Sequence, residues 1–233
     1  TVAHELMHRR APVARAWAEV LMTLVLYPHF CIEHVLGHHR HVATPRDPAS
    51  ARLGESVWSF LPRTVGGGLL SAWRLETERV RAKGVRGLAD RRLRHPLLVL
   101  ALFLGGGLFG GATALGVLFG QAAVAILLLE VVNYIEHYGL ERRPRRDGRF
   151  ERVRPEHSWN SAHRITSWYI FNLNRHSDHH YLASRPYPLL RHFDEAPQLP
   201  AGYPSMVLLA LVPPLWRAVM DPRVDAWNAS TAT

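Results

Sequence analysis

The chain has 233 residues, a formal net charge of +9 and one cysteine, Cys31. The length suits a single large domain, and one cysteine excludes both an internal disulfide and a four-cysteine iron site, so a redox protein of this sequence would take its electrons from elsewhere. The positive charge is almost all arginine, with Lys83 the only lysine. Because the arginines flank apolar segments and no nucleic-acid motif accompanies them, we expect lipid head groups or an acidic protein as partners, and no nucleic acid.

The first element, at the start of the chain, reads His4-Glu5-Leu6-Met7-His8. The spacing of four predicts a helix that carries both histidines on one face. The same pattern is the HExxH signature of zinc proteases, in which the glutamate acts as the base. A protease needs only one more ligand, which leaves most of the other clustered histidines unexplained, so a membrane zinc protease is kept only as an alternative.

The second histidine cluster spans residues 33–39, with the sequence EHVLGHH. Its spacing predicts that His34 and His38 share one helix face. His39 follows directly and is expected to point about 100° further around, toward a second metal ion.

The most apolar segment is Leu97 to Val132, whose only charge is Glu130. As one straight helix, its 36 residues would measure roughly 54 Å, against a hydrocarbon core of about 30 Å. Arginines both precede and follow it, which predicts that both ends lie on the cytoplasmic side. We therefore predict a transmembrane hairpin over about 97–133, with its turn near Gly110 to Gly116. One long buried helix of a soluble protein is the alternative.

Two more histidine clusters follow this segment. His137 lies in NYIEHYGL, at the end of the second predicted crossing, and residues 175–180 read RHSDHH. Within RHSDHH, His176 and His179 are three residues apart and are expected to form an i,i+3 pair, and His180 is the next residue.

The four clusters together hold nine histidines, and neutral imidazole is the commonest metal ligand. One ion needs three or four protein ligands, so nine predict two ions. The predicted ligands are His4, His8, His34, His38, His39, His137, His176, His179 and His180. Acids beside them are expected to orient the imidazoles through hydrogen bonds, and His157 is expected to line the site without binding metal. The acids are Glu5, Glu33, Glu136 and Asp178.

This set of motifs resembles the membrane-bound, histidine-rich di-iron family of desaturases and hydroxylases, and within it the alkane hydroxylases. The motifs that carry the resemblance are EHVLGHH, NYIEHYGL, HSWNS and RHSDHH, together with residues 43–62 and 191–206. The likeness extends from Thr1 to about Asp221.

The resemblance implies an all-α integral membrane protein with a cytoplasmic histidine-rich cap. It implies two iron ions held by the nine histidines, and conversion of a terminal methyl group of an n-alkane to a primary alcohol. The co-substrate is O2, and the electrons come from rubredoxin, which a rubredoxin reductase recharges. It places the protein in the bacterial inner membrane as a multi-pass enzyme, with its active site on the cytoplasmic side.

The resemblance also leads us to expect that residues 1–233 form one domain lacking about four N-terminal transmembrane helices of the family. A related di-iron hydroxylase or desaturase, acting on xylene or a fatty acyl chain, is the main alternative function.

Overall fold

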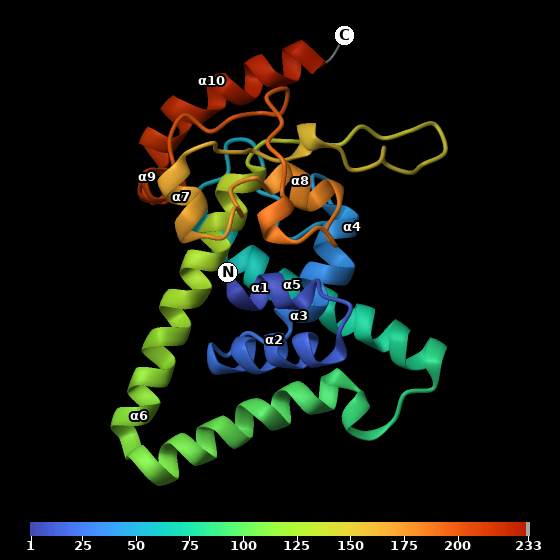
Figure 1. The fold of residues 1–233 in the computed structure, drawn as a ribbon, viewed down its shortest axis with the longest axis vertical. Coiled ribbons are helices and arrows are strands. Elements are labelled where there is room, and N and C mark those ends of the chain that lie inside the picture. Colours follow the sequence, from blue (N-terminus) through green and yellow to red (C-terminus); the bar gives the residue numbers. More distant parts are fainter. Residues whose placement is uncertain (232–233) are drawn as a thin grey trace. The chain divides into compact units, whose positions relative to one another are not determined.

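The computed structural model describes residues 1–231, and its secondary structure within them is helical, with β contacts limited to two isolated bridges. This confirms the predicted all-α fold (Figure 1). The α-helices are α1 (Val2–Met7), α2 (Pro12–Leu24), α3 (Phe30–Glu33), α4 (His39–His41), α5 (Val57–Lys83), α6 (Arg91–His137), α7 (Arg164–Tyr169), α8 (His176–Tyr181), α9 (Tyr203–Ala210) and α10 (Pro213–Thr231). A π-helical turn, His34–His38, joins α3 to α4, and short 3₁₀ turns occur at Gly87–Ala89, Pro155–His157 and Tyr187–Leu189.

The chain divides into two compact units. Unit 1 contains residue 1, residues 38–65 and the chain from Glu130 onward. Unit 2 contains residues 2–37 and 66–129. Helices α5 and α6 each contribute residues to both units.

In unit 2, α2 is tied to both arms of α6. The Arg94 guanidinium donates to the Glu19 carboxylate at 2.7 and 2.8 Å, and the Gln121 amide donates to the Leu24 carbonyl oxygen at 2.8 Å. Figure 1 shows α2 in the angle between these arms. The buried Glu76 carboxylate of α5 binds Arg91 at the start of α6, which fixes these two helices to each other within the unit.

Helix α6 has 47 residues and is interrupted at Gly111, where φ is 59° and ψ is −152°. A positive φ of this kind suits glycine, because a side chain there would be strained. The interruption falls within residues 110–116, where the sequence predicts a turn. Beside it, the ring centroids of Phe103 and Phe119 lie 5.1 Å apart, so the two arms contact each other near the bend.

Within residues 1–231, α6 is the single helix that is long and apolar enough to cross a membrane. Helices α9 and α10 meet the same criteria only when taken together, and they are bent by 119° at the break between them.

In unit 1, an aromatic core surrounds the last turns of α6. The rings of Phe60, Tyr134, Tyr138 and Trp216 follow one another at centroid distances of 5.2–5.4 Å. The Tyr134 hydroxyl donates to the Glu55 carbonyl oxygen at 2.7 Å, and the Tyr138 hydroxyl donates to the Asp221 carboxylate at 2.6 Å. Since buried aromatic side chains supply large contact area, this core holds the end of α6 rigidly.

The segment HSWNS closes the end of α6. The Trp159 backbone N–H donates to the Glu136 carbonyl oxygen at 2.8 Å, and its indole N–H donates to the Tyr138 carbonyl oxygen at 2.9 Å. These bonds satisfy carbonyl groups that a helix end leaves without an intrahelical partner. The next residue, Asn160, accepts a bond from the Ser177 backbone N–H at 2.9 Å, which connects the segment to the start of α8.

Candidate metal sites

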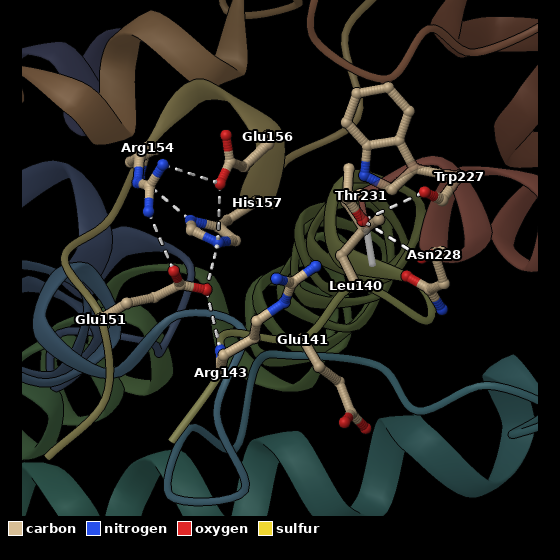
Figure 2. Close-up of a pocket in the computed structure, with 10 residues that line it drawn as sticks. All are labelled: Leu140, Glu141, Arg143, Glu151, Arg154, Glu156, His157, Trp227, Asn228 and Thr231. Atoms are coloured by element: carbon tan, nitrogen blue, oxygen red, sulfur yellow. Dashed lines mark hydrogen bonds and ion pairs between the residues drawn. The ribbon is translucent and has the colours of Figure 1, made fainter. Parts of the chain in front are cut away.

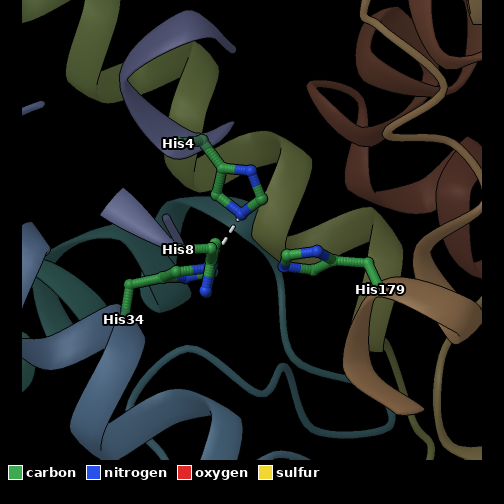
Figure 3. Close-up of side chains that lie close together, drawn as sticks. All are labelled: His4, His8, His34 and His179. Carbon is green, nitrogen blue, oxygen red and sulfur yellow. Dashed lines mark hydrogen bonds between the residues drawn. The ribbon is translucent and has the colours of Figure 1, made fainter. Parts of the chain in front are cut away.

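Three predicted ligands come together in unit 2 and form the three-histidine group, His4, His8 and His34. The His34 Nε2 atom lies 2.8 Å from that of His4 and 3.1 Å from that of His8. Figure 3 shows the three rings turned toward one another. His4 belongs to α1 and His8 follows it directly, so the predicted spacing of four does place both on one side.

Four predicted ligands come together in unit 1 and form the four-histidine group, His38, His137, His176 and His180. All four are buried, and their nearest ring nitrogens lie within 4.8 Å of one another. The His176 Nε2 atom lies 3.1 Å from that of His137 and 2.9 Å from that of His180.

The last two predicted ligands, His39 and His179, form a pair in unit 1 with their Nε2 atoms 3.0 Å apart. The His39 ring also lies beside that of His180, with centroids 4.4 Å apart. The pair is therefore continuous with the four-histidine group.

The donor geometry suits metal ions. Two nitrogen ligands about 2.1 Å from one ion lie roughly 3.0–3.4 Å apart at angles of about 90–110°. The separations above are close to this range. Burial of the His180 ring lowers its pKa well below the ordinary value, and repulsion from the neighbouring imidazoles lowers it further. The ring is therefore neutral, as a metal ligand must be. These residues could hold transition-metal ions, for which imidazole is a suitable ligand.

Two predicted pairings differ in the structure. His34 and His38 belong to different groups, because the turn between them is π-helical and its hydrogen bonds step by five residues instead of four. In α8, His176 is grouped with His180 and not with His179, because the i,i+4 pair shares one face of this helix.

Asp47 orients a ligand of the four-histidine group. The His38 Nδ1 donates to the Asp47 carboxylate at 2.8 Å, and the Ser50 hydroxyl donates to the same oxygen at 2.6 Å. Burial alone would raise the pKa of Asp47, but the His38 imidazole and the Ser50 hydroxyl outweigh it and lower the pKa. The carboxylate fixes the His38 tautomer with its proton on Nδ1, so the Nε2 lone pair is available to a metal ion.

Replacing Asp47 with asparagine is expected to lower metal affinity about 10–100-fold, because the amide no longer fixes the His38 tautomer. Iron per chain, measured against a competing chelator, tests this. Asp225→Asn is the control, since Asp225 lies exposed on α10. Unchanged affinity in Asp47→Asn would show that His38 needs no such partner.

The side chain of Glu33 occupies the space where a side chain at Gly37 would lie. A Cβ atom on Gly37 would lie 2.0 Å from the Glu33 Oε2 atom and 2.6 Å from its carboxyl carbon. Glu33 is itself buried, next to His34. The missing side chain at Gly37 therefore positions this carboxylate within the π-helical turn.

Gly37→Ala is expected to destabilise the protein by about 1–3 kcal/mol, the usual cost of overpacking a buried site. Thermal unfolding in detergent measures the effect. Gly66→Ala is a matched control, because a Cβ at Gly66 meets nothing within 4 Å. Alanine favours a helix over glycine by roughly 1 kcal/mol, so the control is expected to keep or gain stability. Equal behaviour of both variants would contradict the role of Gly37.

Glu136 meets the four-histidine group directly. Its Oε2 atom lies 3.2 Å from the His176 Nε2 atom, and its Oε1 atom accepts a hydrogen bond from the Tyr203 hydroxyl at 2.9 Å. The predicted role was different: the carboxylate was expected to accept a hydrogen bond from the ring nitrogen that does not bind the metal.

The other two predicted acids bind arginines. Glu5 forms an ion pair with Arg9, one turn further along the chain. Asp178 is fully buried and accepts hydrogen bonds from the Arg185 guanidinium at 2.6 Å and from the Arg191 backbone N–H at 2.8 Å. Asp178 therefore fixes the segment after α8.

His157 lines a separate polar cavity of about 290 Å³ in unit 1. Its Nδ1 accepts from the Arg154 backbone N–H at 3.0 Å, and its Nε2 lies 3.3 Å from the Glu151 carboxylate. Figure 2 shows His157 between Glu151 and Glu156, with Trp227 across the cavity. None of the nine clustered histidines is among the residues that line this cavity.

Two residues that contact the candidate site, Asp47 and Tyr203, are not among those predicted from the sequence. Each contacts a residue of the candidate site across a loop or a long stretch of chain, so no local spacing reveals it. Both do lie in segments that carry the family resemblance, residues 43–62 and 191–206.

The comparisons with known proteins agree on one group of enzymes. The sequence profile described as fatty acid desaturase matches residues 1–210. The chain is 51% identical over 230 residues to alkane 1-monooxygenase 1 of Pseudomonas aeruginosa, an alignment that covers 98% of this chain. It is 46% identical to alkane 1-monooxygenase of Acinetobacter baylyi, with 95% of this chain covered. It is 31% identical, over 100% of this chain, to the hydroxylase component XylM of xylene/toluene monooxygenase from Pseudomonas putida.

The chain spans only part of these relatives. The three alignments cover 60%, 55% and 62% of the length of the respective relative. The remaining length of each relative is not matched by residues 1–233.

Proposed function

Because the chain belongs to the fatty acid desaturase family, we propose that it is the histidine-rich part of a membrane-bound alkane monooxygenase. The observation that carries the proposal is the convergence of the four buried imidazole groups of the four-histidine group, in a chain whose relatives include several alkane 1-monooxygenases. Such relatives act, by their names, on alkanes.

The proposed reaction hydroxylates a terminal methyl group. An n-alkane, O2, two electrons and two protons give a primary alcohol and water. A saturated methyl group has no acidic proton and no polarised bond, so acid–base or nucleophilic catalysis by side chains has no point of attack. Bound iron would supply the redox chemistry that activates O2.

The ligands of two iron ions are proposed to be the nine histidines. The three-histidine group would hold one ion and the four-histidine group the other, with His39 and His179 completing the set. The contribution of this chain is to hold neutral Nε2 atoms in place. Asp47 does this for His38, and the aromatic core of unit 1 does it for the end of α6 that carries His137.

We place residues 97–133 in the membrane as a hairpin with its turn at the Gly111 interruption. The exposed apolar side chains of α6 support this, since Leu108 is 80% exposed and Phe109 is 94% exposed. Such a surface is unfavourable in water and favourable in lipid. With arginines on both sides of the segment, both its ends would lie in the cytoplasm, in the inner membrane of a bacterium.

The electron donor is proposed to be rubredoxin, recharged by its reductase. The chain has one cysteine, Cys31, and so cannot build a four-cysteine iron site of its own. Rubredoxins are typically acidic, and the arginine-rich segments of this chain offer complementary charge.

If docking is electrostatic, turnover driven by rubredoxin is expected to fall about tenfold or more between 50 and 300 mM salt, because salt screens attraction between exposed charges. The rate of alcohol formation at a fixed, limiting rubredoxin concentration measures this. Turnover driven by a small uncharged reductant is the control. A flat response in both assays would contradict electrostatic docking.

A second candidate is hydroxylation of the methyl group of an aromatic substrate, favoured by the similarity to XylM. The test of both is product analysis by gas chromatography after incubation with n-octane, n-hexadecane or xylene, with O2, rubredoxin and reductase. The proposal predicts 1-alkanols. Benzylic alcohol alone would favour the second candidate, and a mixture dominated by secondary alkanols would contradict terminal hydroxylation.

A further inference from the structure

The carboxylate of Glu136 lies against His176, at the edge of the four-histidine group. Glu136 is 1% exposed and immediately precedes His137 at the end of α6. Its Oε2 atom is 3.2 Å from the His176 Nε2 atom. That nitrogen is the one that faces the His137 and His180 Nε2 atoms, at 3.1 and 2.9 Å.

A carboxylate that only orients a ligand contacts the other ring nitrogen, as Asp47 does with Nδ1 of His38. Glu136 instead contacts Nε2 of His176, the same nitrogen that faces His137 and His180. Two donors of one metal ion at about 2.1 Å, at angles of about 90–110°, lie roughly 3.0–3.4 Å apart. The separation of 3.2 Å between Glu136 and His176 matches that of two ligands on one ion.

Tyr203 holds this carboxylate in place. Its hydroxyl donates to the Glu136 Oε1 atom at 2.9 Å, and its side chain is buried at the start of α9. With Oε1 engaged by Tyr203, Oε2 is the oxygen directed at His176. The Trp159 N–H fixes the backbone of Glu136 as well, at 2.8 Å from its carbonyl oxygen.

We propose that Glu136 is an oxygen ligand at the His176 edge of the four-histidine metal site, and that Tyr203 is the positioning residue that directs it. This inference rests on the proposed iron-binding function. Four neutral imidazoles bring no negative charge to a divalent ion, whereas the carboxylate brings one. With this carboxylate, the ion in the four-histidine group has a ligand set different from that of an ion held by imidazoles alone. The carboxylate also favours iron, since carboxylate and imidazole together are common iron ligands.

The test is ⁵⁷Fe Mössbauer spectroscopy and chelator competition on the purified holoenzyme and its Glu136→Gln, Tyr203→Phe and Glu141→Gln variants. Glu136→Gln keeps the shape and removes the charge, and it is expected to lower the affinity for one iron at least tenfold and to change the spectrum of that iron. Tyr203→Phe is expected to shift the same signal by less. Glu141→Gln, an exposed glutamate four residues past His137, is expected to match the wild type.

A wild-type spectrum and affinity in Glu136→Gln would overturn the inference, while iron in the wild-type protein would leave the proposed function standing. A wild-type protein that binds no iron would instead overturn the proposed function itself. If Glu136→Gln does not fold, the Mössbauer spectrum of Tyr203→Phe tests the inference instead. A shifted iron signal in that variant supports the inference, and an unshifted signal contradicts it.

Discussion

Replacing His176 with alanine is expected to remove the metal ion from the four-histidine group and to lower hydroxylation more than about 100-fold. Its Nε2 atom is the donor that lies close to those of both His137 and His180. Loss of a residue that merely supports a ligand already costs about 10–100-fold, so loss of the ligand itself is expected to cost more. Iron per chain and the rate of 1-alkanol formation measure the two effects.

His192→Ala is the matched control, because His192 lies outside both groups and pairs with the exposed Asp194 at 3.1 Å. It is expected to retain its iron and its activity. Wild-type iron content in His176→Ala would mean that His176 is not a ligand.

The second large effect is the loss of one iron ion at a time, from either the three-histidine group or the four-histidine group. The double variant His4→Ala/His8→Ala removes two donors of the three-histidine group, and His137→Ala/His180→Ala removes two donors of the four-histidine group. Each is expected to bind one iron per chain in place of two, because each double variant loses two of the imidazole donors that converge on one ion. Each is expected to lose hydroxylation, since the proposed reaction uses both ions.

Mössbauer spectra of the two double variants are expected to be different, and to add up to the wild-type spectrum. The control, His163→Ala/His192→Ala, is expected to retain two irons. Loss of both ions in each double variant would rule out independent sites, and retention of both would rule out these ligands.

Clusters of histidine are visible in the sequence because their members are close neighbours along the chain. The predicted HExxH pair, His4 and His8, does converge, and His34 joins it. What spacing could not predict is which neighbour shares a site. The π-helical turn separates His34 from His38, and in α8 His180 takes the place beside His176 that was expected for His179. Such choices depend on backbone geometry and on packing between distant segments.

The residues that support or complete the sites were the least predictable. Asp47 reaches His38 through a loop that spans nine residues, and Tyr203 reaches Glu136 from another helix, 67 residues away. Proximity in sequence selected Glu5 and Asp178, but these carboxylates bind Arg9, and Arg185 with Arg191, respectively. An acid beside a ligand in sequence points in a different direction from that ligand on a helix, so adjacency is a poor guide to contact.

The helical class and the interruption in α6 follow from simpler signals. A long apolar run without strand alternation favours helix, and a glycine-rich stretch permits the positive φ found at Gly111. The proposed membrane hairpin depends on the same composition and on the arginines at its two ends.

The most direct measurement of the central claim is the metal content of the protein purified from membranes, by mass spectrometry of the elements together with Mössbauer spectroscopy. Two irons per chain, lost in the histidine variants above, is the result that we predict. One zinc per chain without iron would contradict the claim, and would favour a protease built on His4, Glu5 and His8.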